Sequence, residues 1–210
     1  MNPRKTASII IILACFALTA YYYPKLPDTM ANHWDAEGNV NGYSSKSPSV
    51  FLIPVMCSGL YLLFLILPKI DPLKKNIELF MREYETFIII FLTFMLAIQV
   101  QTILWNTGTQ ISMNLTMPLL LAGLFYYIGI LMESARRNWF IGIRTPWTLS
   151  SDIVWEKTHR LGAKLFKISA GFALISIITP YTILVAVAPI LISSLYLFIY
   201  SYLEYKKIEK

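Results

Sequence analysis

The chain has 210 residues, of which 56% are hydrophobic and only 14% are charged. A soluble domain carries about a quarter charged residues, so this composition excludes an ordinary water-soluble protein. The net charge of +6 is interpreted as a record of membrane orientation, since a basic balance in a membrane chain usually has that origin.

Apolar runs long enough to cross a bilayer predict an all-α integral membrane protein with six transmembrane helices. The predicted spans are residues 6–23, 49–67, 86–105, 113–132, 165–179 and 182–202. A helix of about 20 residues, at about 1.5 Å per residue, matches a hydrocarbon core of about 30 Å. The fifth run is short, so its helix is expected to begin earlier, in the polar segment before it. The first run ends in an aromatic cluster, so we expect a retained span instead of a cleaved signal peptide.

Positive charges lie almost entirely in one set of connections. The N-terminus, residues 68–85, residues 133–167 and the C-terminal tail hold 16 of the 18 Lys and Arg residues. Residues 24–48 and 106–112 together hold the other 2. The positive-inside rule therefore predicts that both termini are cytosolic, and that residues 24–48 form the one sizeable external loop.

The external loop carries turn chemistry and a cluster of polar and aromatic side chains. Gly38 and the pair Asn41-Gly42 favour tight turns, so we expect a small hairpin-like loop over the helix ends. The candidate residues of an external binding surface are His33, Trp34, Asp35 and Gly38. His33, Asp35 and Glu37 leave a weak cation site open, but the ligand spacing of a zinc site is absent. A polar–aromatic contact of His33 and Trp34 at the membrane interface is the alternative.

Two connections on the predicted cytosolic side differ in character. Residues 73–84, after Pro68 and Pro72, form an amphipathic helical pattern expected on the membrane surface. The second connection, residues 138–160, is too rich in charge to cross the bilayer and too apolar for a free loop. It is therefore expected to be an ordered interfacial segment, packed on the helix bundle or on a partner.

Within residues 138–160, Gly142 and Pro146 are expected to bend the chain. Arg144 at that bend is suited to a carboxylate, a lipid phosphate or backbone carbonyls. Ser150 is the expected N-cap of the fifth helix, with an acidic residue in its first turn. The following turns place Trp155, His159, Gly162 and Phe166 on one face, and Glu156 and Arg160 form an i,i+4 pair beside it. The candidate binding or structural residues are Asn138, Trp139, Gly142, Arg144, Thr145, Pro146, Trp147, Trp155, His159 and Arg160.

Catalysis and ion-coupled transport are poorly supported by the residue pattern. The chain has no Gly-rich phosphate loop, no G-x-S-x-G elbow and no Cys–His pair on one side, so we predict no enzyme and no cofactor. The central parts of the spans hold no ionisable residue, which argues against proton coupling but leaves a small-solute transporter or passive pore open. Gln99, Gln101 and Asn114, the notably polar residues of the spans, are expected to hydrogen-bond between helices. Cys15 and Cys57 are interpreted as packing residues.

A long motif in the interfacial segment resembles a known family. Asn138-Trp-Phe-Ile-Gly-Ile-Arg-Thr-Pro-Trp-Thr-Leu-Ser, with Trp155-Glu-Lys-Thr-His-Arg-Leu-Gly, is similar to the signature of SdpI-like immunity proteins. The external loop resembles an uncharacterised module that often precedes this signature. The resemblance implies a multi-pass plasma-membrane protein that protects a cell from a secreted toxic, antimicrobial peptide.

The same resemblance implies signal transduction through a cytosolic transcriptional repressor held at the membrane, with no direct contact to nucleic acid. Membrane lipid is the remaining expected partner, and both a monomer and a homo-oligomer stay open. We divide the chain into an N-terminal two-span module (1–67), a connection with the third span (68–112) and a C-terminal immunity-like module (113–210).

Overall fold

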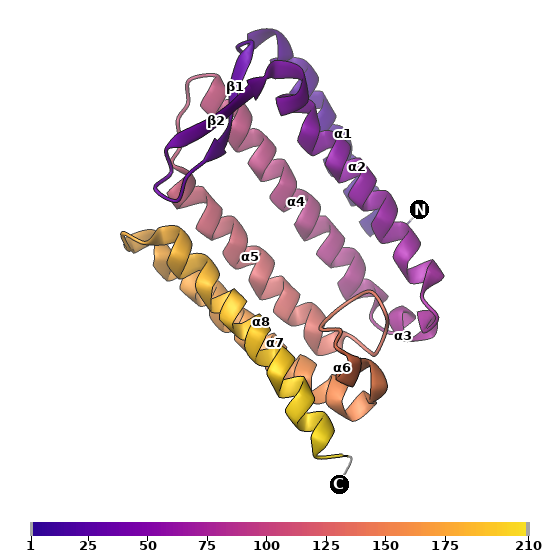
Figure 1. Ribbon diagram of the computed structural model, residues 1–210. Helices are drawn as coiled ribbons and strands as arrows, with labels where there is room; N and C mark the ends of the chain where they lie inside the picture. The colour runs from indigo at the N-terminus through magenta and orange to yellow at the C-terminus, as the bar shows by residue number, and fades with distance from the viewer. Residues whose placement is uncertain (1, 209–210) are drawn as a thin grey trace.

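The computed structural model describes residues 2–208 and contains six long helices that run side by side, with a small β-hairpin at one end (Figure 1). Each of the six is long and apolar enough to cross a membrane, which confirms the predicted all-α membrane fold. The long helices are α1 (Pro3–Tyr22), α2 (Lys46–Ile70), α4 (Met81–Asn106), α5 (Met113–Ser134), α7 (Asp152–Ile175) and α8 (Thr182–Lys206). The short elements are the 3-10 turns η1 (Tyr23–Lys25) and η2 (Ser176–Ile178), the helices α3 (Lys74–Glu78) and α6 (Pro146–Ser150), and the strands β1 (Thr29–Trp34) and β2 (Val40–Ser45).

The fifth span begins well before its apolar run, as expected. Helix α7 starts at Asp152, and the side chain of Ser151 caps it by accepting a hydrogen bond from the backbone N–H of Val154. The prediction that Ser150 is the cap is wrong by one residue. Ser150 instead ends α6, where its hydroxyl donates to the carbonyl of Pro146 at 2.7 Å.

The predicted amphipathic helix of residues 73–84 is divided in two. Helix α3 ends at Glu78, and α4 begins at Met81. The expected apolar face is nevertheless buried at Ile77, Phe80 and Tyr84. The break allows one buried face to continue from the surface segment into a membrane span.

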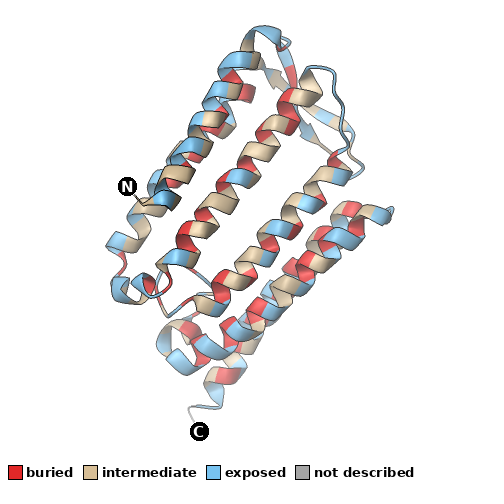
Figure 2. Cartoon of the chain, turned by 180° about the vertical axis from the view of Figure 1, so that it is seen from behind, coloured by how far each residue is buried: buried red, intermediate tan, exposed pale blue. Residues whose placement is uncertain are grey.

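The six helices pack as two groups of three. Helices α1, α2 and α4 contact one another, as do α5, α7 and α8, and α4 packs on α5 to join the groups. Buried residues form inward-facing stripes, while the outer faces expose large apolar side chains (Figure 2). Helix α5 approaches α7 closely at Gly129, where an added Cβ would lie 2.8 Å from the carbonyl oxygen of Ala163. Small residues at such crossings let membrane helices pack by van der Waals contact.

Amide side chains connect the helices of the first group, α1, α2 and α4, and the loop that follows them. Gln99 donates to the hydroxyl of Thr19 at 2.9 Å and to the carbonyl of Val50 at 3.0 Å, which joins α4 to α1 and α2 as predicted. Gln101 differs from the prediction, since it donates to the loop carbonyl of Ile111 at 2.7 Å. The buried Gln101 amide, near the end of α4, thus fixes the loop between α4 and α5.

The two ends of the bundle carry different structures. The start of α1 and the end of α8 lie toward the end that also holds α3, α6 and residues 138–160, which we name the motif end. There Asn2 donates to the carboxylate of Glu85 at the start of α4, and Lys157 pairs with Glu204 at 2.7 Å. The β-hairpin occupies the opposite end, named the hairpin end (Figure 1). The assignment of the motif end to the cytosol stays a prediction from charge.

Candidate functional site

The hairpin at the hairpin end is an irregular antiparallel pair. Its turn spans residues 35–39, where Asp35 Oδ1 accepts the backbone N–H groups of Glu37 and Asn39 and Gly38 has φ +87°. The expected turn at Asn41-Gly42 is wrong, because both residues lie in β2. Gly42 is opposite His33, and a Cβ there would come 2.7 Å from the His33 Cβ. Its role is close approach of two strands.

Side chains from two helices hold the hairpin in place. Asn106 of α4 pairs with both backbone groups of Ala31, accepting from its N–H at 2.8 Å and donating to its carbonyl at 2.9 Å. The Trp34 ring packs edge-to-face on Trp105, with ring centroids 5.6 Å apart. Asn114 of α5 donates to the carbonyl of Glu37 at 3.0 Å. The hairpin therefore bridges the two helix groups.

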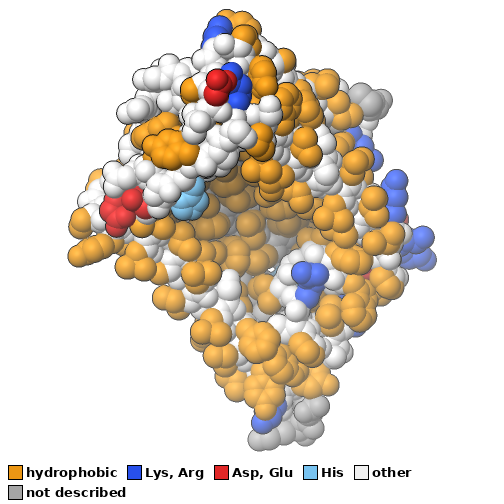
Figure 3. Space-filling view, turned by 45° about the horizontal axis from the view of Figure 1, so that its top comes forward, with side chains coloured by type: hydrophobic (Ala, Val, Ile, Leu, Met, Phe, Trp, Pro, Cys, Tyr) orange, Lys and Arg blue, Asp and Glu red, His pale blue; other side chains and the backbone are white. Residues whose placement is uncertain are grey.

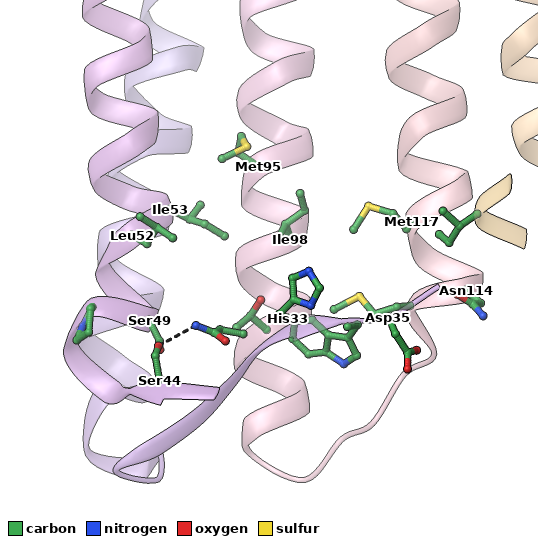
Figure 4. Close-up of a pocket in the computed structure, with 16 residues that line it drawn as sticks. His33, Asp35, Ser44, Ser49, Leu52, Ile53, Met95, Ile98, Asn114 and Met117 are labelled. Atoms are coloured by element: carbon green, nitrogen blue, oxygen red, sulfur yellow. Dashed lines mark hydrogen bonds between the residues drawn. The ribbon is translucent and has the colours of Figure 1, made fainter. Parts of the chain in front are cut away.

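A cavity of about 580 Å³ lies beneath the hairpin, among α2, α4, α5 and the start of α8. Figure 3 shows the molecule hollowed there, with hydrophobic side chains lining the hollow. Its floor is apolar and is formed by Leu52, Ile53, Met95, Ile98, Met113, Met117 and Ile183. Its rim is polar and includes Asn32, His33, Asp35, Ser44, Ser49 and Asn114 (Figure 4). An apolar pocket with a few convergent polar groups is the usual form of a ligand site.

The predicted external residues lie at this cavity. His33, Trp34 and Asp35 line it, and Gly38 lies beside Asn114, where an added Cβ would be 3.3 Å from the Asn114 side chain. The floor was not foreseen, because its residues are apolar members of apolar spans and only the packing of four helices brings them together. Asn114 was noted in sequence only as a polar residue, and its position at the start of a span was the available signal.

Two polar atoms at the cavity lack a hydrogen-bond partner. They are the indole N–H of Trp34 and the side-chain carbonyl oxygen of Asn114, both buried. Buried polar groups in folded proteins nearly always have a partner, so each exception has a structural or functional cause. One is a donor and the other an acceptor, and this pair distinguishes the cavity from a simple apolar gap.

His33 and Asp35 of the hairpin have other partners. His33 Nδ1 lies 2.5 Å from the side-chain oxygen of Asn41, and Asp35 binds the amides of its own turn. No group of three His, Cys, Asp or Glu side chains within residues 2–208 is arranged to hold a metal ion. The geometry therefore lends no support to the weak cation site that the sequence left open.

At the motif end, Asn138 closes the loop that follows α5. Its Oδ1 accepts the backbone N–H groups of Phe140 at 2.9 Å and Ile141 at 2.6 Å. Its Nδ2 donates to the carbonyls of Arg136 at 2.8 Å and Ile141 at 2.9 Å. The fully buried amide thus uses both its donor and acceptor groups within the loop. Its chemistry is that of a fixed structural centre.

His159 holds the next part of the motif. Its ring stacks on Trp155 with centroids 3.9 Å apart, and its Nε2 accepts the backbone N–H of Ile143 at 3.0 Å. The ring proton therefore resides on Nδ1, which donates to the Trp155 carbonyl at 2.9 Å. Gly142 has φ +112°, and a Cβ at this position would lie under 3.0 Å from His159 Nε2. Both ring nitrogens are occupied, which leaves His159 no free nitrogen to act as a general base.

The short helix α6 joins the motif to α8. Thr145 and Thr148 cap it reciprocally, and Pro146 occupies its first turn. The hydroxyl of Thr145 also lies 3.0 Å from that of Ser201 in α8. The Trp147 ring packs on two aromatic rings of the same helix, Phe198 and Tyr202. These contacts fix the bend that Pro146 introduces.

Asp71 is a motif-end residue that sequence reasoning missed. It is 3% exposed, and its Oδ2 accepts the backbone N–H of Trp139 at 2.8 Å while Oδ1 accepts that of Leu73 at 2.6 Å. Nearby, Asn76 donates to the carbonyl of Arg137 at 2.7 Å. A single acidic residue between a span and Pro72 was the only sequence signal. These bonds connect the 68–80 segment to the motif across the bundle.

The exposed part of the motif presents aromatic and charged groups. Arg144 donates to the backbone carbonyl of Trp139 at 3.0 Å, one of the three kinds of partner expected for it. Trp139 itself is 49% exposed. Arg160 pairs with Glu156 at 2.7 Å, as the i,i+4 spacing predicted, and both are solvent-exposed. A polar cleft of about 630 Å³ runs past Arg160, Trp155 and Arg136. The motif therefore has a buried scaffold and a polar outer surface.

Comparisons with known proteins match both ends of the chain. The SdpI/YfhL protein family matches residues 134–201, and a domain of unknown function, DUF1648, matches residues 10–57. The immunity protein SdpI of Bacillus subtilis (strain 168) is 30% identical over 209 residues, which are 98% of this chain and 97% of that protein. No solved structure matches the chain.

Proposed function

Because this chain belongs to the SdpI-like family and is a multi-pass plasma-membrane protein, we propose that it protects its own cell from a secreted toxic peptide. The observation that carries the proposal is the similarity to an immunity protein over nearly the whole of both chains. The similarity spans the hairpin, the cavity and the motif together. It therefore extends well beyond a shared set of apolar helices.

The two ends of the bundle suit two parts of this function. With the motif end in the cytosol, as positive charge predicts, the hairpin and its cavity face the side from which a secreted peptide arrives. His33, Trp34 and Asp35 then meet the peptide first. Binding at this surface fits a chain whose apolar runs hold no ionisable residue in their central parts better than pumping does.

The exposed motif surface suits a cytosolic partner, which we propose to be a transcriptional repressor. Trp139 and Arg144 are exposed, and aromatic and Arg side chains are the groups most often responsible for affinity at protein interfaces. The buried residues beneath them, Asn138 and His159, would keep that surface in one shape.

The test of immunity is growth of a toxin-sensitive host that expresses the chain. Cells are challenged with the secreted peptides encoded beside its gene, and an empty vector is the control. We expect survival of expressing cells only. Survival accompanied by rapid solute flux in liposomes containing the purified protein would instead indicate a transporter. Failure to protect at normal membrane abundance would contradict the proposal.

The motif surface is tested separately with Arg144→Ala. The side chain is exposed and makes a hydrogen bond only to the Trp139 carbonyl among the described contacts, so we expect unchanged abundance and unchanged protection. Recruitment of a repressor to the membrane, measured by co-purification, should fall. Arg82→Ala, also basic and predicted to be cytosolic, is the matched control. Equal recruitment by both variants would exclude Arg144 from the partner surface.

A further inference from the structure

The cavity beneath the hairpin has the chemistry of a binding site and not of a packing defect. Three of its floor residues, Met95, Met113 and Met117, are methionines. Their unbranched, polarisable side chains adapt to apolar ligands of varied shape. A volume of about 580 Å³ is within the range of small-ligand pockets and accommodates several apolar side chains at once.

The two unpartnered atoms narrow the class of ligand. The Trp34 indole N–H requires an acceptor, and the Asn114 side-chain oxygen requires a donor. A peptide backbone offers both a carbonyl and an N–H, whereas a lipid acyl chain offers neither. Both atoms are buried in the free protein, so a ligand in the cavity pairs with them only after a small local rearrangement of the site.

The charge at the rim of the cavity further limits the class of ligand. Asp35 and Glu37 lie in the turn of the hairpin, and both lysines of the loop are engaged elsewhere. Lys46 pairs with Asp28 at 3.2 Å, and Lys25 lies over the Tyr21 ring at 3.8 Å. The rim is therefore net negative and disfavours an acidic ligand.

We propose that this cavity binds an apolar, uncharged or cationic segment of a peptide chain, with its side chains on the methionine floor and its backbone paired to Trp34 and Asn114. The inference rests on the proposed function, since it specifies which surface of the protein meets the toxic peptide and which part of that peptide is recognised. The hairpin acts as the cover of the site.

The first test uses a short capped peptide of leucine and isoleucine that carries a photoreactive leucine analogue. The full-length protein is placed in lipid nanodiscs, irradiated with the peptide and mapped by mass spectrometry. We expect adducts on the methionine floor. Met117→Trp, which fills the cavity, should abolish them, and Leu119→Trp on the exposed face of the same helix should not. Equal labelling of both variants, or labelling confined to outer faces, would overturn the proposal.

The second test is Trp34→Phe, which removes the indole N–H and keeps an aromatic ring against Trp105. Because the N–H has no partner in the free protein, thermal stability should not fall. Peptide affinity should weaken about fivefold, as expected for one lost hydrogen bond. Unchanged affinity would contradict the assigned donor. A photoreactive fatty acid that labels the same floor and displaces the peptide would identify a lipid site and overturn the inference.

A host-protection assay separates this inference from the proposed function. Protection that survives Met117→Trp at normal abundance would exclude the cavity as the toxin site and leave immunity standing. A wild-type chain that binds the peptide probe in the cavity but gives no protection would contradict the proposed immunity and leave the site standing. Loss of protection in Met117→Trp, with protection kept by Leu119→Trp, supports both the proposed immunity and the cavity as the toxin site.

Discussion

The contact between Gly142 and His159 gives a quantitative test of the motif's buried scaffold. Gly142→Ala places a Cβ under 3.0 Å from His159 Nε2, at a backbone φ of +112° that L side chains rarely adopt. The strained backbone costs about 1–3 kcal/mol. Displacement of the ring leaves the Ile143 N–H without its acceptor, which costs about 1–3 kcal/mol more. We therefore expect destabilisation of about 2–6 kcal/mol, comparable to the whole stability of many domains.

The assay is thermal unfolding of the purified variant in detergent, with membrane abundance as a second readout. Gly171→Ala, in the helix that carries His159, is the matched control, since an added Cβ there meets no atom within 4 Å. A helix-interior alanine should leave stability equal or raise it by about 0.5–1 kcal/mol. In a His159→Ala background, Gly142→Ala should lower the stability only by the cost of the strained backbone. A Gly142→Ala protein that unfolds at the temperature of the Gly171→Ala control would refute the proposed contact.

Three further predictions concern helix packing, the buried aspartate and orientation. Gly129→Ala should destabilise the protein by about 1–3 kcal/mol, because the added Cβ would lie 2.8 Å from a backbone oxygen of α7. Gly123→Ala on the same helix is the control and should not destabilise, because its Cβ meets no atom within 4 Å. Equal melting temperatures of the two variants would contradict the close crossing of α5 and α7. Asp71→Asn should lower stability by about 1–3 kcal/mol through loss of an acceptor for the Trp139 N–H, and Asp152→Asn, at an exposed ion pair, should cost less than about 1 kcal/mol. A C-terminal alkaline phosphatase fusion should stay inactive while a fluorescent protein fusion is bright, and the opposite pattern would invert the predicted orientation.

Much of the interfacial motif was readable from sequence because its physical constraints are local. The Glu156–Arg160 pair and the shared face of Trp155 and His159 follow from helical spacing alone. The early start of α7 followed from the shortness of its apolar run. By contrast, the cap was misplaced from Ser151 to Ser150, since the short helix α6 was not recognised and two adjacent serines carry the same capping signal.

The hairpin, too, was predicted in part and misplaced in part. Turn residues predicted that residues 24–48 would fold back on themselves, yet Asn41-Gly42 was the stronger turn signal and was not used. The turn lies instead at residues 35–39, where Asp35 accepts the backbone N–H groups of Glu37 and Asn39 and Gly38 has a positive φ. Asn106 and Asn114, far along the chain, then hold the hairpin on the helices, and sequence alone did not indicate those contacts.

The sequence by itself determined that this is a six-helix membrane protein, because apolar runs of membrane length and their flanking charges depend on the chain alone. Only the tertiary structure decided which apolar residues form the floor beneath the hairpin, and which buried atoms are left unpaired there. It also brought Asp71 to the motif across an interval of 68 residues. Residues in different spans look alike in sequence, and this cavity exists only because four separate helices place their side chains around one space.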